Sequence, residues 1–213
     1  MTFRCRAVLF DMDGTLVDST AAVEAQWGRW APRHGLKLAD VLRVSHGRPS
    51  METMRMLAPG AATPEEHERF MREEEAHEAG AVEIAGAVDF VARLPRGRWA
   101  VVTSAPRALA KMRIAAAGFP APPVLIAPED VTRGKPDPAP YLLAAERLGI
   151  PPAACLVVED TRAGLDSALA AGMMAIGITT TFTRERLACA HTMADFRALT
   201  VAREGDELLV TLR

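Results

Sequence analysis

The strongest constraint on the fold is a short stretch near the start of the chain, residues 7–18 (AVLFDMDGTLVD). Its four leading apolar residues, 7–10, predict a short buried strand rather than an amphipathic helix. Asp11 and Asp13 follow, and in extended backbone their side chains point the same way, because side-chain direction repeats every second residue. Two like charges held so close repel each other, which predicts a cation or a proton between them. Asp and Gly are also common turn residues, so the pair alone is equally compatible with an ordinary turn.

Length and composition favour a soluble globular protein. The chain has 213 residues, of which 49% are hydrophobic and 24% charged, with a net charge of −2. This is enough for one core, or for a core domain with a smaller domain inserted. Scattered lysines and arginines give no sign of a nucleic-acid or membrane partner, and no segment has the pattern of a leader or a membrane span. Three widely spaced cysteines argue against a disulfide framework or a thiolate zinc site and suit a reducing cytoplasm.

The segment between Asp18 and about Ile84 has only helical patterns. After a first helix that ends at a break over residues 32–35, helical segments are predicted around residues 38–44, 50–57 and 64–80. The last of these has a strong start signal, with proline at its first position and acids in its first turn. We therefore expect residues 18–85 to form an all-helical insertion.

From Gly86 onward, strand and helix patterns alternate. The predicted strands are residues 99–103, 124–127, 156–158 and 175–178, and the predicted helices are 87–94, 104–117, 137–149 and 163–171. Alternation of this length predicts a parallel sheet sandwiched by helices. The expected fold is thus α/β, with a Rossmann-like core made of residues 1–17 and 86–213, which ends in a β-hairpin over residues 199–212.

Polar side chains gather where the predicted strands end. Asp11 and Asp13 end one strand, Ser104 ends a second, the dipeptide Glu159-Asp160 ends a third, and Lys135 lies in a Gly-Lys-Pro loop. The carboxyl ends of parallel strands share one edge of a sheet, so these groups are expected to converge.

The expected cluster calls for a cation and offers donors to an anion. Two unit charges 4 Å apart interact by roughly 4 kcal/mol at an effective dielectric constant of 20. Several carboxylates therefore need a cation between them, and an all-oxygen set suits Mg²⁺. Ser104, at the expected start of a helix, and Lys135 are surplus donors of the kind that a phosphate dianion requires.

Four segments resemble, in order, the four motifs of haloacid dehalogenase-like hydrolases: residues 11–15 (DMDGT), 101–104 (VVTS), 134–136 (GKP) and 157–160 (VVED). The helical insertion between the first two resembles the subclass I cap of that family. The resemblance covers nearly the whole chain, and four motifs in register are far more specific than a lone DxDGT. It implies an enzyme that depends on Mg²⁺ and transfers phosphoryl groups.

The resemblance also implies roles for the acids. Asp11 would be the nucleophile that forms an aspartyl-phosphate, and Asp13 would be the general acid and base. Asp11, the backbone carbonyl of Asp13, and Asp160 would bind Mg²⁺. Glu159 would either join them or lie just behind them.

The donors receive roles from the same resemblance. Lys135 would neutralise Asp11 and, with Ser104 and Ala105, hold the oxygens of the transferring phosphoryl group. For Lys135 alone, a solvated loop cation is the simpler structural explanation, but it does not account for the expected convergence.

The branch of the family is indicated by two positions. Asp13 favours phosphate esters over carbon–halogen bonds, because an alkoxide leaving group needs an acid and the dehalogenase branch has a non-acidic residue there. The β-phosphoglucomutase branch has a histidine five residues beyond the aspartate matching Asp18, where this chain has Val23. Hydrolysis is therefore the prediction, and mutase-like transfer is the alternative. A non-catalytic regulatory or binding module with this fold is a second alternative.

The loop at residues 45–50 is expected to set substrate specificity. His46, Gly47 and Arg48 are predicted to contact the substrate, because glycine permits close approach and Arg48 can bind hydroxyls or phosphate. A solvated loop is the alternative. The overall pattern resembles bacterial sugar phosphatases and the related glycerol-phosphate and 2-deoxyglucose-6-phosphate phosphatases. We expect a small phosphorylated sugar or polyol as substrate, and a cytoplasmic monomer or weak dimer.

Overall fold

The computed structural model describes residues 1–45, 49–76 and 80–213, and the chain divides into two compact units. The sheet unit comprises Met1–Asp18 and Val82–Arg213, and the helical unit comprises Ser19–Ala81. The chain leaves and re-enters the sheet unit through two short antiparallel strands, β3 (Val17–Asp18) and β4 (Val82–Glu83). Strand β4 lies in a segment that was predicted to be all-helical, because a two-residue strand has no recognisable period.

The sheet unit is built on a six-stranded sheet in the order β6-β5-β2-β7-β8-β9. Every neighbouring pair in it is parallel, so the predicted α/β fold is confirmed. Its strands are β2 (Ala7–Phe10), β5 (Trp99–Val102), β6 (Leu125–Ile126), β7 (Cys155–Glu159), β8 (Met174–Ile178) and β9 (Thr192–Met193).

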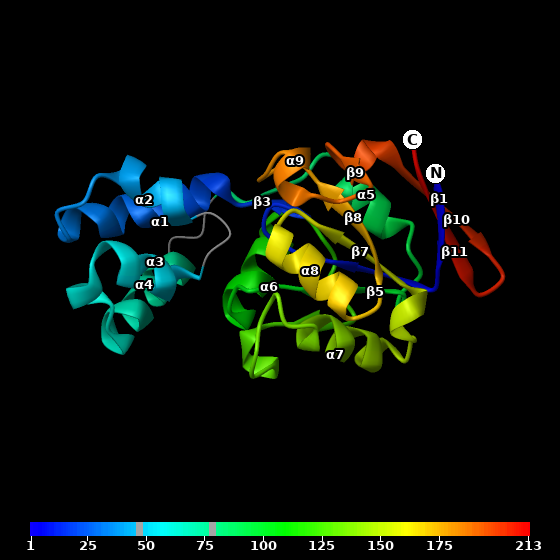
Figure 1. The fold of residues 1–213 in the computed structure, drawn as a ribbon, viewed down its shortest axis with the longest axis horizontal. Helices are drawn as coiled ribbons and strands as arrows, with labels where there is room; N and C mark the ends of the chain where they lie inside the picture. The colour runs from blue at the N-terminus through cyan, green and yellow to red at the C-terminus, as the bar shows by residue number, and fades with distance from the viewer. Residues whose placement is uncertain (46–48, 77–79) are drawn as a thin grey trace. The chain divides into compact units, whose positions relative to one another are not determined.

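Helices cover both faces of this sheet. They are α5 (Ala87–Ala92), α6 (Arg107–Ala116), α7 (Ala139–Leu148), α8 (Arg162–Ala170) and α9 (Arg184–Leu187). Helices α7 and α8 lie beside each other (Figure 1), and Leu9 and Val157 belong to the same buried core cluster as Tyr141 of α7. On the opposite face, the ring of Phe10 contacts that of Phe90 of α5, with 6.2 Å between centroids. The alternation along β2 thus buries Ala7 and Leu9 in the core cluster of α7 and α8, and Phe10 against α5.

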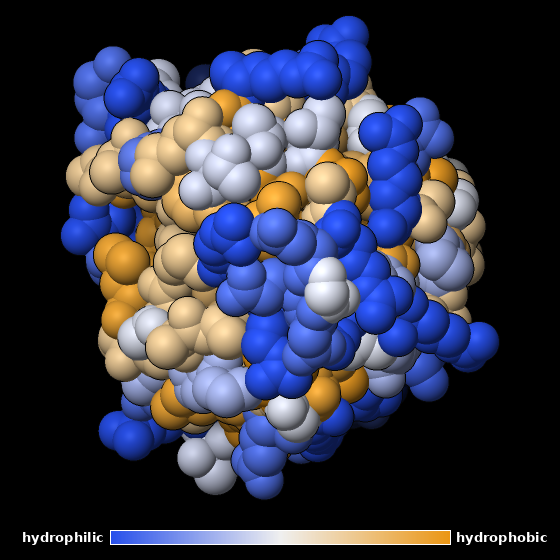
Figure 2. Space-filling view, turned by 90° about the vertical axis from the view of Figure 1, so that its right-hand side faces the viewer, coloured by the Kyte–Doolittle hydropathy of each residue, from blue (hydrophilic) through white to orange (hydrophobic). Residues whose placement is uncertain are grey.

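A second, antiparallel sheet in the order β1-β11-β10 joins the two ends of the chain. Its strands are β1 (Thr2–Cys5), β10 (Leu199–Glu204) and β11 (Glu207–Leu212). The predicted hairpin is confirmed, whereas β1 was not predicted, although its side chains alternate between exposed and buried. The amino group of Met1 donates a 2.7 Å hydrogen bond to the carbonyl of Leu212, and Figure 1 shows the two termini next to each other. On this side of the unit, hydrophilic side chains form a broad band (Figure 2).

The helical unit has its own apolar core. Its helices are α1 (Thr20–Arg33), α2 (Leu38–Ser45), α3 (Ser50–Leu57) and α4 (Pro64–Ala76), with a short 3₁₀ turn at Pro59–Ala61. Trp27, Trp30, Met54 and Phe70 are buried together, and the rings of Trp27 and Phe70 lie 4.6 Å apart. Among the described residues of both units, no helix is long and apolar enough to cross a membrane.

The central position of β2 gives a test of the fold. Leu9 is completely buried, so Leu9→Ala is expected to lower the free energy of unfolding by about 2–5 kcal/mol through the cavity it leaves. Leu169 is 59% exposed, and Leu169→Ala should change stability by no more than about 0.5 kcal/mol. Urea unfolding followed by circular dichroism compares the two variants, and equal losses would contradict the described core.

Candidate active site

Three buried carboxylates meet at the carboxyl ends of β2 and β7. One oxygen atom each from Asp11, Glu159 and Asp160 lies within 4.8 Å of the others. The register explains the meeting, because Phe10 pairs with Val158 in parallel strands and the next residues are acidic on both sides. The backbone N–H of Asp11 continues the ladder with a 3.1 Å hydrogen bond to the carbonyl of Val158.

Lys135 ties the ends of three adjacent strands together. Its Nζ donates to Oδ1 of Asp11 at 2.5 Å, to Oε1 of Glu159 at 2.6 Å and to the carbonyl of Val102 at 2.9 Å. Only 7% of the lysine side chain is exposed. Because Val102 ends β5, Ser104 stands two residues beyond a carbonyl that Lys135 contacts.

Burial makes the charges of this cluster interdependent. It raises the pKa of Asp11 well above the ordinary value, which attraction by Lys135 opposes and repulsion by Glu159 and Asp160 reinforces. The pKa of Asp160 is raised to about 7, first by burial and then by the charge of Glu159, against a hydrogen bond from Thr181. Burial also disfavours charged Lys135, but attraction by the two acids outweighs it and raises the lysine pKa. The single positive charge of Lys135 does not neutralise three carboxylates, so the negative charge that remains favours the binding of a further cation.

Glu159 has its acceptor positions filled by the protein. Its Oε1 accepts from Lys135 and, at 3.1 Å, from the hydroxyl of Tyr141. Its Oε2 accepts from the backbone N–H and the hydroxyl of Thr161, both at 3.0 Å. A carboxylate offers about four such positions. Glu159 is therefore well placed to hold Lys135, while Asp11 and Asp160 are better suited to an ion.

The Asp-Met-Asp-Gly-Thr turn is packed against Asp160. The hydroxyl of Thr15 donates to Oδ1 of Asp160 at 3.3 Å, and the hydroxyl of Thr180 donates to the carbonyl of Gly14. Gly14 has a φ of +81°, and a Cβ there would lie 2.2 Å from Oδ2 of Asp160 and 2.6 Å from Oγ1 of Thr181. Glycine is required by both backbone and space. The result is a compact, oxygen-lined cradle whose donor chemistry fits Mg²⁺.

Asp13 is held by a residue that the sequence analysis missed. Nη1 of Arg113, on α6, donates to Oδ1 of Asp13 at 3.0 Å. The arginine side chain is 3% exposed and that of Asp13 is 30% exposed. The available signal was an arginine between Leu109 and Ile114 on the buried face of a predicted helix, since buried arginine is rare unless paired. Tyr141 was not predicted to belong to the site either, because it lies on a helix and in none of the four motifs.

The loop after β5 differs from its predicted structure. A helix was expected to begin at Ser104, but α6 begins at Arg107 with Pro106 at its N-cap position. Proline disfavours helical backbone in the residue before it, so Ala105 cannot easily start the helix. Ser104 is exposed, and the backbone N–H of Ala105 donates to the hydroxyl of Thr103 at 3.0 Å. Ser104 and Ala105 nevertheless follow the end of β5 at Val102, whose carbonyl accepts a hydrogen bond from Lys135.

Three residues predicted to contact substrate, His46, Gly47 and Arg48, lie outside the described part of the chain. The described residues on either side are Ser45, at the end of α2, and Pro49, before α3. Their role stays a prediction from the sequence.

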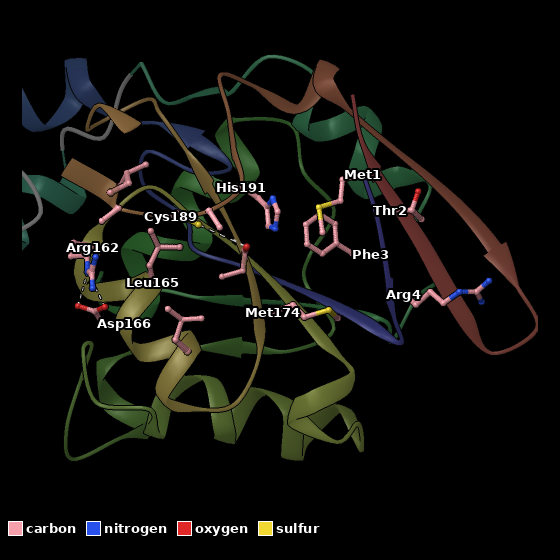
Figure 3. Close-up of a pocket in the computed structure, with 15 residues that line it drawn as sticks. Met1, Thr2, Phe3, Arg4, Arg162, Leu165, Asp166, Met174, Cys189 and His191 are labelled. Carbon is pink, nitrogen blue, oxygen red and sulfur yellow. Dashed lines mark hydrogen bonds and ion pairs between the residues drawn. The ribbon is translucent and has the colours of Figure 1, made fainter. Parts of the chain in front are cut away.

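A pocket of about 770 Å³ lies apart from the acid cluster, since none of the clustered acids nor Lys135 lines it. Its walls come from β1, α8, β8 and α9, and include Phe3, Leu165 and Met174 (Figure 3). Its charged groups include Arg162 and Asp166, which pair with each other at 2.8 Å. This pocket is largely apolar and does not bring the acids and donors of a reaction together.

Comparison with known proteins places these features in a family. A family model described as haloacid dehalogenase-like hydrolase matches residues 5–172. Hexitol phosphatase A of Escherichia coli is 43% identical over 180 residues, which cover 82% of this chain and 83% of that protein. Glycerol-1-phosphate phosphohydrolase 2 of Saccharomyces cerevisiae is 34% identical over 197 residues, which cover 85% of this chain and 78% of that protein. The crystal structure of a HAD hydrolase of family IA, variant 3, from Entamoeba histolytica superimposes on this chain with a TM-score of 0.78 at 25% sequence identity. The match covers 91% of this chain and 95% of that one.

The packing of α8 against Glu159 gives a test of the site. A Cβ added at Gly164 would lie 1.7 Å from Oε1 of Glu159, so Gly164→Ala must displace the carboxylate that holds Lys135. We expect a loss of about 1–3 kcal/mol in stability and a clear loss of any activity that depends on Lys135. Gly134→Ala is the matched control, because a Cβ there meets nothing within 4 Å. Thermal unfolding of both variants measures the difference, and equal melting temperatures would contradict the described contact.

The raised pKa of Asp160 predicts a pH dependence for the metal-free protein. With its pKa raised from 3.8 to about 7, the folded chain keeps a proton in this range that the unfolded chain has lost. The free energy of unfolding should therefore fall as the pH rises through this range, and Asp11 adds to the fall because its pKa is also raised. Melting curves of the wild type and of Asp160→Asn, recorded between pH 5 and pH 7.5 in buffer that contains a metal chelator, isolate the effect. Parallel profiles for the two proteins would refute it.

Proposed function

Since the chain belongs to the haloacid dehalogenase-like hydrolase family, we propose that it is a Mg²⁺-dependent phosphatase acting on a small sugar or polyol phosphate. The proposal rests on one observation above all, the contact of Lys135 with Asp11 inside a buried cluster of acids. The relatives named hexitol phosphatase and glycerol-1-phosphate phosphohydrolase support the substrate class. The enzyme is thus proposed to be a phosphoric monoester hydrolase.

The metal would be held by Asp11, by Asp160 and by the backbone carbonyl of Asp13. When bound, Mg²⁺ supplies positive charge that offsets repulsion between a phosphate dianion and the carboxylates. The oxygen-only donor set and the unbalanced negative charge of the cluster support this assignment. Glu159 contributes by holding Lys135, because its four acceptor positions are occupied.

The reaction proceeds in two displacements. In the first, a carboxylate oxygen of Asp11 forms a bond to phosphorus while the bond to the ester oxygen breaks, and Asp13 donates a proton to the departing alcohol. In the second, Asp13 accepts a proton from water as the water attacks the aspartyl-phosphate, which releases inorganic phosphate and restores Asp11. Lys135 stays protonated because its pKa is raised, so it stabilises the charge on the phosphoryl oxygens. The hydroxyl of Ser104 is proposed to donate to the same oxygens, and so is the backbone N–H of Ala105, which in this structure donates to the hydroxyl of Thr103.

Specificity is proposed to come from the helical unit. Arg48, and His46 less strongly, supply polar groups suited to hydroxyls and phosphate, and Gly47 permits close approach of the ligand. Val23, on α1, takes the position at which the mutase branch carries a histidine, which favours hydrolysis over phosphoryl transfer to a sugar.

Replacing the nucleophile tests the proposed function. Asp11→Asn should reduce phosphate release by at least about 10³-fold, because an amide cannot form the covalent intermediate. Asp89→Asn, at an exposed position of α5, is the matched control and should keep wild-type activity. Phosphate release with Mg²⁺ is measured on hexitol and glycerol phosphates, nucleotides and aromatic esters.

The outcomes separate the candidate functions. Activity confined to nucleotides or aromatic esters would contradict the substrate class, and equal activity of Asp11→Asn would contradict the nucleophile. Inactivity of the wild type on the whole panel would favour the binding module instead.

A further inference from the structure

We propose that Arg113 positions the carboxylate of Asp13 for proton transfer to and from the substrate. The proposal rests on the proposed function, in which Asp13 is the general acid and base. Its geometric basis is the 3.0 Å hydrogen bond from Nη1 of Arg113 to Oδ1 of Asp13, which joins α6 to the turn after β2.

The burial of Arg113 indicates more than a packing role. Its side chain is 3% exposed, and it shares the inward side of α6 with Leu109, Ala110 and Ile114, which are buried as well. An apolar residue would fill this place without the cost of desolvating a charge, whereas a buried guanidinium needs an anion close by. Asp13 supplies that anion from a turn that carries the proposed reaction.

The ion pair of Arg113 with Asp13 also explains how Asp11 and Asp13, two residues apart, can have different roles in the reaction. Lys135 binds Asp11 from the loop before α7, and Arg113 binds Asp13 from α6. Each carboxylate is therefore oriented by its own cation. Asp13 remains 30% exposed, so it can meet a leaving group or water while one of its oxygens is fixed. A proton is transferred efficiently only along a defined line, and a side chain free to rotate loses much of that advantage.

Arg113 is thus a positioning residue, and its effect should depend on the leaving group. An alkoxide must be protonated as it departs, whereas p-nitrophenolate departs without a proton. Loss of Arg113 should therefore impair hydrolysis of an alkyl phosphate much more than that of an aryl phosphate. General disruption of the site would impair both alike.

The experiment measures kcat/KM for a hexitol phosphate and for p-nitrophenyl phosphate, because this constant covers the step in which the leaving group departs. We expect Arg113→Gln to lower the ratio of alkyl to aryl activity about tenfold, a part of the 10²–10⁴-fold that a general acid contributes. Asp13→Asn should lower the ratio further, and the double variant should be no worse than Asp13→Asn alone, since both changes remove the same function. Arg113→Lys should recover part of the ratio. Arg93→Gln, at an exposed position after α5, is the matched control and should match the wild type.

The outcomes distinguish failure of the positioning role of Arg113 from failure of the proposed function. An Arg113→Gln variant that loses both activities equally, or neither, overturns the positioning role while the proposed function stands. If Arg113→Gln fails to fold, Arg113→Lys decides in the same way, with a smaller fall in the ratio expected and an unchanged ratio contradicting the role. A wild type inactive on the whole panel of phosphate esters overturns the proposed function and this inference with it. An Asp13→Asn variant with an unchanged ratio overturns the acid and base role of Asp13, and this inference with it, while phosphatase activity stands.

Discussion

The structure of the sheet unit depends on how buried charge is balanced at one edge of its parallel sheet. Three carboxylates approach within 4.8 Å of one another, and one buried lysine forms ion pairs with two of them, Asp11 and Glu159. This arrangement is costly in a medium of low dielectric constant, and it persists because hydrogen bonds satisfy Glu159 completely and Asp160 in part. The remaining negative charge makes the edge receptive to a divalent ion. The chain also packs closely around these acids. A side chain at Gly14 would clash with Asp160, and one at Gly164 would clash with Glu159.

Strand order brings the cluster about. From β2 the chain adds β5 and then β6 on one side, and after α7 it continues with β7 and β8 on the other. The direction of winding therefore reverses beside β2, and open α/β sheets bind ligands at such a reversal. Asp11 stands at the end of the strand where this occurs, with the end of β5 on one side and Glu159 on the other.

Much of this could be predicted from the sequence, because strand ends are local signals and parallel pairing brings them together. The convergence of Asp11, Lys135, Glu159 and Asp160 follows from four short apolar runs and the residues after them. The partners of Arg113 and Tyr141 could not be found in this way, because they are set by how α6 and α7 pack, which no local pattern encodes. The predicted start of α6 at Ser104 is wrong because Pro106 disfavours helical backbone in the residue before it, so the helix begins at Arg107. Strands of two residues, such as β3 and β4, carry no period to detect.

The pairing of β3 with β4 has a consequence for the architecture. Asp18, where the chain departs, is the cross-strand partner of Val82, where it returns. The 63 residues of the helical unit, Ser19–Ala81, therefore begin and end at adjacent points of a finished scaffold. A tight turn could bridge those points without shifting any strand of the six-stranded sheet. Evolution, or a protein engineer, can accordingly exchange this module while the scaffold and its acid cluster stay intact.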